Sequence, residues 1–272
     1  MTQNFNFKRR EANRKIETYS TFSEAFNCEP TSPMKCLFIT PHDEDTLIGA
    51  GLLLRAAVQS GIKVKLLVTC DASQRYSNIN NQNDIGEIKR KEAILSYFSL
   101  GIKDIEFLNF PDMNLQYFVG RIEACDDDIS IIKDHSGLQN SYTYYIRQFN
   151  PNLIFVSNPL DSYPDHRTVF DEVMSSVVQS ATDIWPELGE PLKKLPRIIE
   201  FPVNRNLAEP PDIKLESNET EKNKKIEALR YFKSQTPLRP FIQNIVAHPP
   251  EEYFRCLDHH FFEPAKYRAL FD

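Results

Sequence analysis

KCLFITPHDEDTLIGAGLLLRAAVQSG, residues 35–61, is the stretch that decides the fold. KCLFIT is a short apolar run rich in strand-forming residues, and TLIGAGLLLRAAVQS has the apolar spacing of a helix that stops at Gly61. The polar segment PHDED lies between them. The stretch therefore predicts a buried strand, a tight polar turn and a helix in direct succession.

The same alternation continues along the chain. Further buried strands are predicted for VKLLVTC (64–70), IEFLNF (105–110) and NLIFVSNP (152–159). Helices are predicted for residues 85–101, 141–149, 168–181 and 224–235. Because strands that alternate with helices pair in parallel, the sequence predicts an α/β fold with a parallel sheet. The acidic and proline-containing region 204–225 is expected to be a loop.

The expected domain organisation is simple. The chain has 272 residues, of which 41% are hydrophobic, enough for one sizeable core. Residues 1–33 are polar and lack clear periodicity, so we expect an N-terminal arm or a helix laid on the outside. Residues 34–272 are expected to form a single domain.

Composition excludes several classes of protein. The net charge is −6 and no basic stripe runs along the chain, so nucleic acid is not an expected partner. No run of about 18 apolar residues predicts a membrane span, and no apolar segment follows the basic start MTQNFNFKRREANRK. The five cysteines are an odd number without a CxxC pair, which favours reduced packing residues and a cytoplasmic location.

Two polar segments follow predicted strands, where parallel sheets bind their ligands. PHDED (41–45) follows the first strand and DSYPDH (161–166) follows the fourth. His42 and Asp45 can converge on one ion across a tight turn, and the sheet would bring His166 close to them. Two imidazoles and a carboxylate suit a catalytic zinc that keeps one position for water. Glu44 is then the carboxylate left to act as a general base.

These motifs resemble the LmbE/PIG-L deacetylases. KCLFITPHDEDTLIGAG is similar to that family's strand followed by AHPDDE, and DSYPDH is similar to its HPDH segment. Supporting similarities are RKEAILSYFSLGI, FLNFPDMNL, NPNLIFVSNPLDSYPDHRTV and KIEALRYFKSQ, in the family's order. The resemblance covers roughly residues 34–256. It implies a Rossmann-like three-layer α/β/α fold with a mostly parallel sheet. Family members are often multimeric, so a homo-oligomer is one possibility, and the sequence leaves the oligomeric state open.

The resemblance also implies an activity and a set of site residues. The activity is hydrolysis of an N-acetyl group, often on a glucosamine-containing small molecule, with a divalent metal that is commonly Zn²⁺. The motifs place His42, Asp45 and His166 on the metal ligands and Glu44 on the catalytic aspartate, which activates the metal-bound water. Arg90 falls on an arginine associated with substrate binding. Asp165, in the same turn as His166, is expected to bond the far nitrogen of a ligating histidine.

Three positions depart from the family pattern. Glu44 stands where the family has aspartate, which adds a methylene to the base. Asp43 replaces the motif's proline and Thr46 its glutamate, so Asp43 is a second candidate for the base. Tyr163 replaces the first histidine of HPDH, and its phenol can donate a hydrogen bond to an oxyanion but is a weaker acid than imidazolium.

Other functions remain open at this point. A noncatalytic sugar-binding or interaction protein could keep the fold after its altered motifs had lost turnover. Dinucleotide binding at Gly49 and Gly51 lacks the third glycine of the fingerprint. A phosphoacceptor module that uses the acidic cluster and Mg²⁺ leaves His42 and His166 unexplained. The neighbouring His259 and His260 are excluded as ligands, because adjacent residues of a strand point apart.

Overall fold

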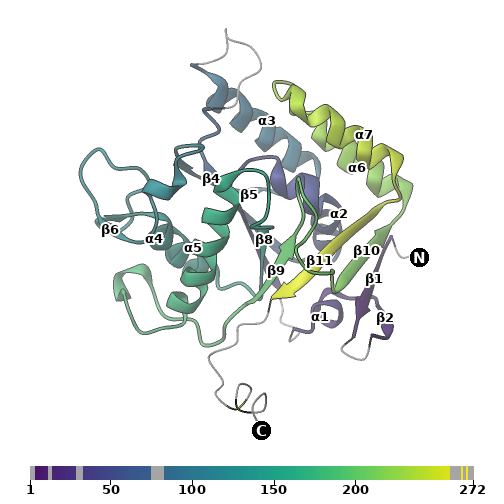
Figure 1. The fold of residues 1–272 in the computed structure, drawn as a ribbon, viewed down its shortest axis with the longest axis horizontal. Coiled ribbons are helices and arrows are strands. Elements are labelled where there is room, and N and C mark those ends of the chain that lie inside the picture. Colours follow the sequence, from purple (N-terminus) through teal and green to yellow (C-terminus); the bar gives the residue numbers. More distant parts are fainter. Residues whose placement is uncertain are drawn as a thin grey trace.

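The computed structural model describes residues 4–11, 14–28, 33–74 and 83–257, together with residues 265 and 268. Its centre is a nine-stranded sheet in the order β2-β1-β10-β11-β9-β8-β3-β4-β5. Helices cover both faces of this sheet (Figure 1). The structure confirms the Rossmann-like three-layer α/β/α fold that the sequence predicts.

Five strands form the parallel half of the sheet. They are β3 (Lys35–Thr40), β4 (Lys63–Cys70), β5 (Asp104–Phe110), β8 (Leu153–Ser157) and β9 (Arg197–Phe201). Residues 36–40 of β3 and the whole of β8 are buried. Burial on both faces explains why these strands are continuous apolar runs in the sequence. All four strands predicted from the sequence are therefore present, as β3, β4, β5 and β8.

The antiparallel half is formed by four further strands, which the sequence analysis did not predict. They are β1 (Phe5–Arg10), β2 (Ile16–Tyr19), β10 (Ile213–Ser217) and β11 (Glu251–Leu257). The expected loop 204–225 therefore contains a strand, and it also contains the start of the helix α6 (Glu219–Leu229). The segment before residue 34, where an outer arm or helix is expected, supplies β1, β2 and the short helix α1 (Phe22–Ala25). These strands carry many charges, so their apolar pattern is weak.

The sheet divides the hydrophobic core into two parts, each covered by helices. α2 (Asp45–Gln59), α3 (Ile85–Ser99) and α6 (Glu219–Leu229) pack on one face of the sheet, over Phe38 and Phe155. α4 (Leu138–Phe149) and α5 (Pro164–Ser180) pack on the other face, over Ile39 and Val156. α7 (Arg239–Ala247) lies beside α6 at the periphery and has no buried residue (Figure 1). Among the described residues, no helix has both the length and the apolarity needed to cross a membrane.

α2 differs from the expected continuous helix, because its backbone breaks at Ala50, where φ is −140° and ψ is 23°. Just before the break, Gly49 lies against the end of β9. A Cβ atom at Gly49 would lie 2.3 Å from the carbonyl oxygen of Pro202. The glycine in this helix is thus explained by close packing, and the alternative of a dinucleotide-binding turn is not needed.

Candidate active site

The turn after β3 brings His42 and Asp45 together. The backbone N–H of His42 donates to Asp45 Oδ2 over 2.9 Å, and the Thr40 hydroxyl donates to the His42 carbonyl over 3.2 Å. The hydroxyl of Tyr97 on α3 donates to the carbonyl of Asp43 over 2.7 Å. These hydrogen bonds hold the backbone of the turn to α2, to β3 and to α3. Asp45 is the first residue of α2, so its carboxylate lies at the helix N-terminus, where negative charge is favoured.

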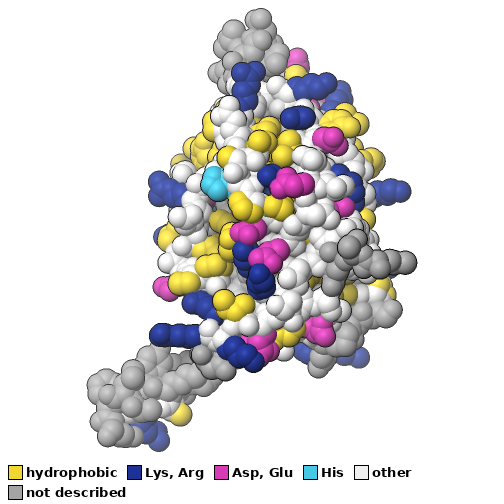
Figure 2. Space-filling view, turned by 90° about the vertical axis from the view of Figure 1, so that its right-hand side faces the viewer, with side chains coloured by type: hydrophobic (Ala, Val, Ile, Leu, Met, Phe, Trp, Pro, Cys, Tyr) yellow, Lys and Arg dark blue, Asp and Glu magenta, His cyan; other side chains and the backbone are white. Residues whose placement is uncertain are grey.

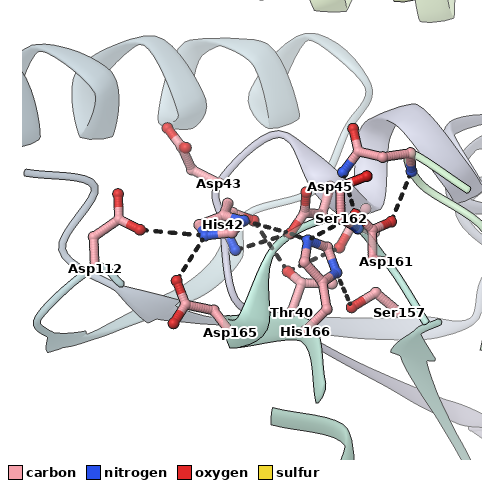
Figure 3. Close-up of polar contacts among 12 residues, drawn as sticks. Thr40, His42, Asp43, Asp45, Asp112, Ser157, Asp161, Ser162, Asp165 and His166 are labelled. Carbon is pink, nitrogen blue, oxygen red and sulfur yellow. Dashed lines mark hydrogen bonds and ion pairs between the residues drawn. The ribbon is translucent and has the colours of Figure 1, made fainter. Parts of the chain in front are cut away.

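His42, Asp45 and His166 form one buried group of potential metal ligands. Asp45 Oδ2 lies 3.3 Å from Nδ1 of His42 and 3.7 Å from Nε2 of His166 (Figure 3). Ligand atoms of a tetrahedral metal with bonds of about 2.1 Å lie roughly 3.4 Å apart. Both separations are close to that value. Two imidazoles and one carboxylate therefore fit a divalent metal in composition and in spacing.

The remaining nitrogen of each histidine faces a protein group. Nε2 of His42 lies 3.3 Å from Asp112 Oδ1 and 3.4 Å from Asp165 Oδ2 (Figure 3). Nδ1 of His166 lies 2.9 Å from the hydroxyl of Ser157, the last residue of β8. Metal-binding histidines commonly have such a partner, which fixes the tautomer and the orientation of the ring. Asp165, which starts α5 with His166, is itself held by the backbone N–H of Met113 over 2.9 Å.

A second group of potential ligands contains His42 again, with Cys70, Asp112 and Asp165. His42 is the residue that the two groups share. Its Nδ1 faces Asp45 of the first group, and its Nε2 faces Asp112 and Asp165 of the second. Burial raises the pKa of the Cys70 thiol to about 12. Because a metal binds the thiolate, this environment disfavours Cys70 as a ligand. The geometry therefore favours a supporting role for this group, on the far side of His42 from Asp45.

A cavity of about 360 Å³ lies beside the potential metal ligands and includes Asp45 in its lining. Glu44, Asp45 and Tyr163 line it, as do Lys89 from α3 and Gln235 from the segment after α6. The ring of Tyr163 meets the ring of His42 edge-on, with the centroids 6.0 Å apart. The cavity thus brings together one proposed ligand, Asp45, and two of the sequence-predicted catalytic side chains, Glu44 and Tyr163.

Asp43 and Glu44 are adjacent but face different surroundings. Glu44 lines the cavity, whereas the Asp43 side chain points away from His42 and His166 (Figure 3). The Asp43 carboxyl lies 3.4 Å from the amide nitrogen of Gln235. Burial and the charge of Glu44 raise the pKa of Asp43 well above its usual range. This environment therefore favours the protonated form of Asp43.

Arg90 is not brought to this cavity. Its guanidinium lies over the ring of Phe107, 4.9 Å from the centroid, and donates to the side chain of Asn109. Both partners are on β5. The preceding residue, Lys89, is 3% exposed and lines the cavity instead. Glu92, on the same helix, bonds the backbone and hydroxyl of Ser234 and so holds the segment that carries Gln235.

Sequence reasoning did not assign four residues that the structure brings to the site. They are Lys89, Asp112, Ser157 and Gln235. Asp112 and Ser157 lie at the carboxyl ends of strands, which was a usable signal, although Asp112 could equally have capped a turn. Lys89 lies among charged helix residues and Gln235 lies in a connection, so neither carries a signal. His259 and His260 lie outside the described residues.

Comparisons with known proteins agree with this architecture. Residues 37–177 match the PIG-L family, described as GlcNAc-PI de-N-acetylase. Diacetylchitobiose deacetylase of Thermococcus kodakarensis is 26% identical over 167 residues, which are 56% of this chain and 56% of that protein. The chain thus spans little more than half of this relative's length.

Solved structures share the fold. N,N'-diacetylchitobiose deacetylase from Pyrococcus horikoshii, in complex with an inhibitor, superposes with a TM-score of 0.66 at 22% identity, over 88% of this chain and 94% of that one. The 4-carboxy-2-hydroxymuconate hydratase GalB from Pseudomonas putida superposes with a TM-score of 0.63 at 14% identity, over 85% and 98%. The fold is therefore shared by proteins with different reactions. The match over half of its length, together with the HDED turn and the DSYPDH segment, makes this chain a member of the PIG-L family.

Proposed function

We propose that this protein is a metal-dependent hydrolase that removes the N-acetyl group from an amino sugar. The observation that carries the proposal is the buried donor set of His42, Asp45 and His166, whose Asp45 lines the same cavity as Glu44. A binding protein has no need for a base beside a metal. A hydrolase needs both groups within reach of one water molecule.

The ligands are His42 through Nδ1, His166 through Nε2, and Asp45. When bound, a divalent metal, with zinc as the first candidate, polarises a carbonyl and lowers the pKa of a coordinated water. Asp165 and Asp112 hold Nε2 of His42, which leaves Nδ1 for the metal. The supporting observation is that both carboxylates are almost fully buried around this one nitrogen.

Glu44 is the general base that accepts a proton from the attacking water. Its position at the cavity wall supports this role, whereas Asp43 is directed to Gln235. Tyr163 lies on the same wall and donates a hydrogen bond to the oxygen that becomes negative. Lys89, rather than Arg90, is the cation that contacts the sugar, because only Lys89 lines the cavity.

The names of the relatives support a substrate class. The family description names a de-N-acetylase of a glucosamine-containing lipid, and the relative from Thermococcus kodakarensis is named for a diacetylated disaccharide. Both names point to an acetylated glucosamine unit. We therefore assign an N-acetylglucosamine unit as the group from which this chain removes acetate.

The test combines metal content with product release. The purified protein is expected to hold about one zinc ion per chain, and to release acetate and free amine from N-acetylglucosamine or its oligomers. A His42→Ala, His166→Ala double variant that keeps the wild-type circular dichroism should lose both properties. Metal binding without hydrolysis of any acetylated sugar would favour the noncatalytic sugar-binding protein. Absence of metal after incubation with zinc would refute the mechanism.

A further inference from the structure

A second cavity, of about 1100 Å³, lies at the edge of the sheet opposite the candidate active site. Its lining includes Lys35 at the start of β3, Asn152 just before β8 and Arg197 at the start of β9. His42 and His166 follow the other ends of β3 and β8. Because β3 has six residues, the strands separate the two sites by roughly 16 Å or more. A ligand in the second cavity is therefore not the molecule that reacts at the active site.

The described lining of the second cavity is basic. Five cations and one acid belong to it: Lys35, Arg147, Lys193, Lys194 and Arg197, and Glu190. Residues 29–32, which follow the lining residue Cys28, lie outside the described part of the chain. Figure 2 views the molecule from the side on which α6 and α7 lie in Figure 1, and there acidic and basic side chains are interspersed. The second cavity thus gathers positive charge in a chain whose net charge is −6.

The packing of the helices accounts for two of these cations. Lys35 donates to the carbonyl of Phe149, the last residue of α4, over 3.0 Å. Arg147 donates to the carbonyl of Ser180, the last residue of α5, over 3.2 Å. Cations are expected at such helix ends, where the helix dipole is negative. Lys193, Lys194 and Arg197 come instead from KKLPR (193–197), which leads into β9 and ends no helix.

The cations of KKLPR converge on one part of the wall, around Cys28. Burial raises the pKa of the Cys28 thiol, and the positive charges of Arg197 and Lys194 oppose this rise. Both cations are therefore close to the same point. An N–H group of Arg197 donates to the carbonyl of Asn27 over 2.9 Å, which holds the guanidinium beside Cys28. A positioned guanidinium beside two lysines suits the oxygens of a phosphate group.

The rest of the lining indicates that the phosphate belongs to a larger molecule. Asn27 and Asn150 supply side-chain amides, which offer both donors and acceptors. The apolar surface consists of prolines and leucines: Pro33, Pro151, Pro191, Leu192, Leu195 and Pro196. Cavities of several hundred Å³ with apolar walls and a few polar groups suit an organic ligand rather than a single inorganic ion. A heterocyclic base combines flat apolar faces with an edge of donors and acceptors, and so matches these walls.

We propose that the second cavity binds a nucleoside diphosphate. Its phosphates contact Lys193, Lys194 and Arg197, and its base packs on the prolines and leucines of the lining. This ligand is distinct from the substrate, because the strands of the sheet separate the two sites. The inference therefore goes beyond the proposed function and does not depend on it.

The first test is calorimetric titration of the full-length protein with ADP and with UDP. We expect at least one of them to bind, and the Lys193→Gln, Lys194→Gln double variant to lose about tenfold or more in affinity. Lys103→Gln is the matched control, since Lys103 is an exposed lysine just before β5 and outside the lining. The His42→Ala, His166→Ala variant should bind like wild type. Binding of neither nucleotide, an unchanged affinity in the double lysine variant, or loss of binding in the double histidine variant would overturn the inference.

Two further measurements identify the ligand and its place. Pyrophosphate and the free nucleosides should each bind more weakly than the nucleotide, and equal affinity for any of them would refute the assignment to a nucleoside diphosphate. The nucleotide should also slow alkylation of Cys28 by iodoacetamide, followed by peptide mass spectrometry, and leave the exposed Cys125 unaffected. An unchanged rate at Cys28 would place the ligand elsewhere. None of these outcomes depends on acetate release, so the proposed function and this inference can fail separately.

Discussion

Glu252 and Lys225 form a buried ion pair inside the break of α2. Lys225 Nζ lies 2.7 Å from Glu252 Oε1 and donates to the carbonyl of Ile48 over 2.6 Å. The Glu252 carboxylate accepts the backbone N–H groups of Leu52 and Leu53 over 2.7 and 2.9 Å. The carboxylate therefore caps the start of the second helical segment, and the ammonium caps the end of the first turn. The pair supplies bonds that the broken helix cannot make for itself.

Removal of one member of this pair should be costly. Glu252→Leu leaves a buried ammonium and two unbonded N–H groups, so we expect the free energy of unfolding to fall by about 3–5 kcal/mol. Buried ion pairs can often be replaced by two apolar residues with little loss. Here the double variant Lys225→Met, Glu252→Leu should stay as unstable as the single variant, because the backbone groups remain unbonded. Urea unfolding measures both, and recovery of the double variant to near wild-type stability would contradict this account.

Substitutions of the two neighbouring carboxyl groups, Asp43 and Glu44, should have different effects on kcat. Glu44→Gln removes the proposed base and should lower kcat by about 10²- to 10⁴-fold. Asp43→Asn imitates the protonated carboxyl that burial and Glu44 favour, so it should keep most of the activity. Acetate release under saturating substrate measures both variants, with zinc content as the control for an intact site. A larger loss in Asp43→Asn than in Glu44→Gln would exchange the two roles.

Lys89 and Arg90 are adjacent cations on α3, so variants of the two residues form a matched test of substrate binding. Lys89→Met removes the ammonium from the cavity and should lower kcat/KM by about tenfold, mainly through a higher KM. Arg90→Met removes a side chain that lies on Phe107, so it should change stability slightly and KM little. Steady-state kinetics on the same acetylated sugar measures both. A KM effect confined to Arg90→Met would restore Arg90 as the substrate-binding residue.

Arg147 on α4 is expected to be essential for stability rather than for activity. The five N–H groups of its buried guanidinium are shared among six carbonyl oxygens, those of Gln179, Ser180, Thr182, Ile184, Trp185 and Gly189. Arg147→Lys offers only three donors, so several buried carbonyls lose their partner. We expect a loss of about 3 kcal/mol in the free energy of unfolding, measured by urea titration. A loss below about 1 kcal/mol would mean that water replaces these bonds.

The parts of the fold that could be predicted are those whose cause is local. β3 and β8 are buried on both faces, so their sequences are continuous apolar runs. β10 carries the sequence IKLES and is only partly buried, which hides it among polar residues. The break in α2 could not be predicted, because its partners, Lys225 and Glu252, are distant in sequence and reach it only in the folded sheet.

The residues of the candidate site likewise include some that the sequence predicts and some that it does not. His42, Asp45, Glu44 and His166 directly follow strands or begin helices, so the fold class alone brings them to one edge of the sheet. Lys89 was missed because its neighbours, Arg90 and Lys91, give that helix the sequence of a solvated face. The direction in which each side chain leaves α3 decides which cation meets the cavity. That direction depends on how α3 packs on the sheet, which the sequence pattern did not specify.

The order of strands in the sheet has a consequence for synthesis of the chain. Phe7 of β1 pairs with Leu215 of β10, and β11 lies between β10 and the parallel strands. While the chain emerges from the ribosome, the parallel strands and their helices can therefore assemble first. β1 can pair at once with β2, but its other edge must wait for β10, about two hundred residues later. Newborn chains would then expose one unpaired strand edge, the kind of surface that chaperones protect from aggregation.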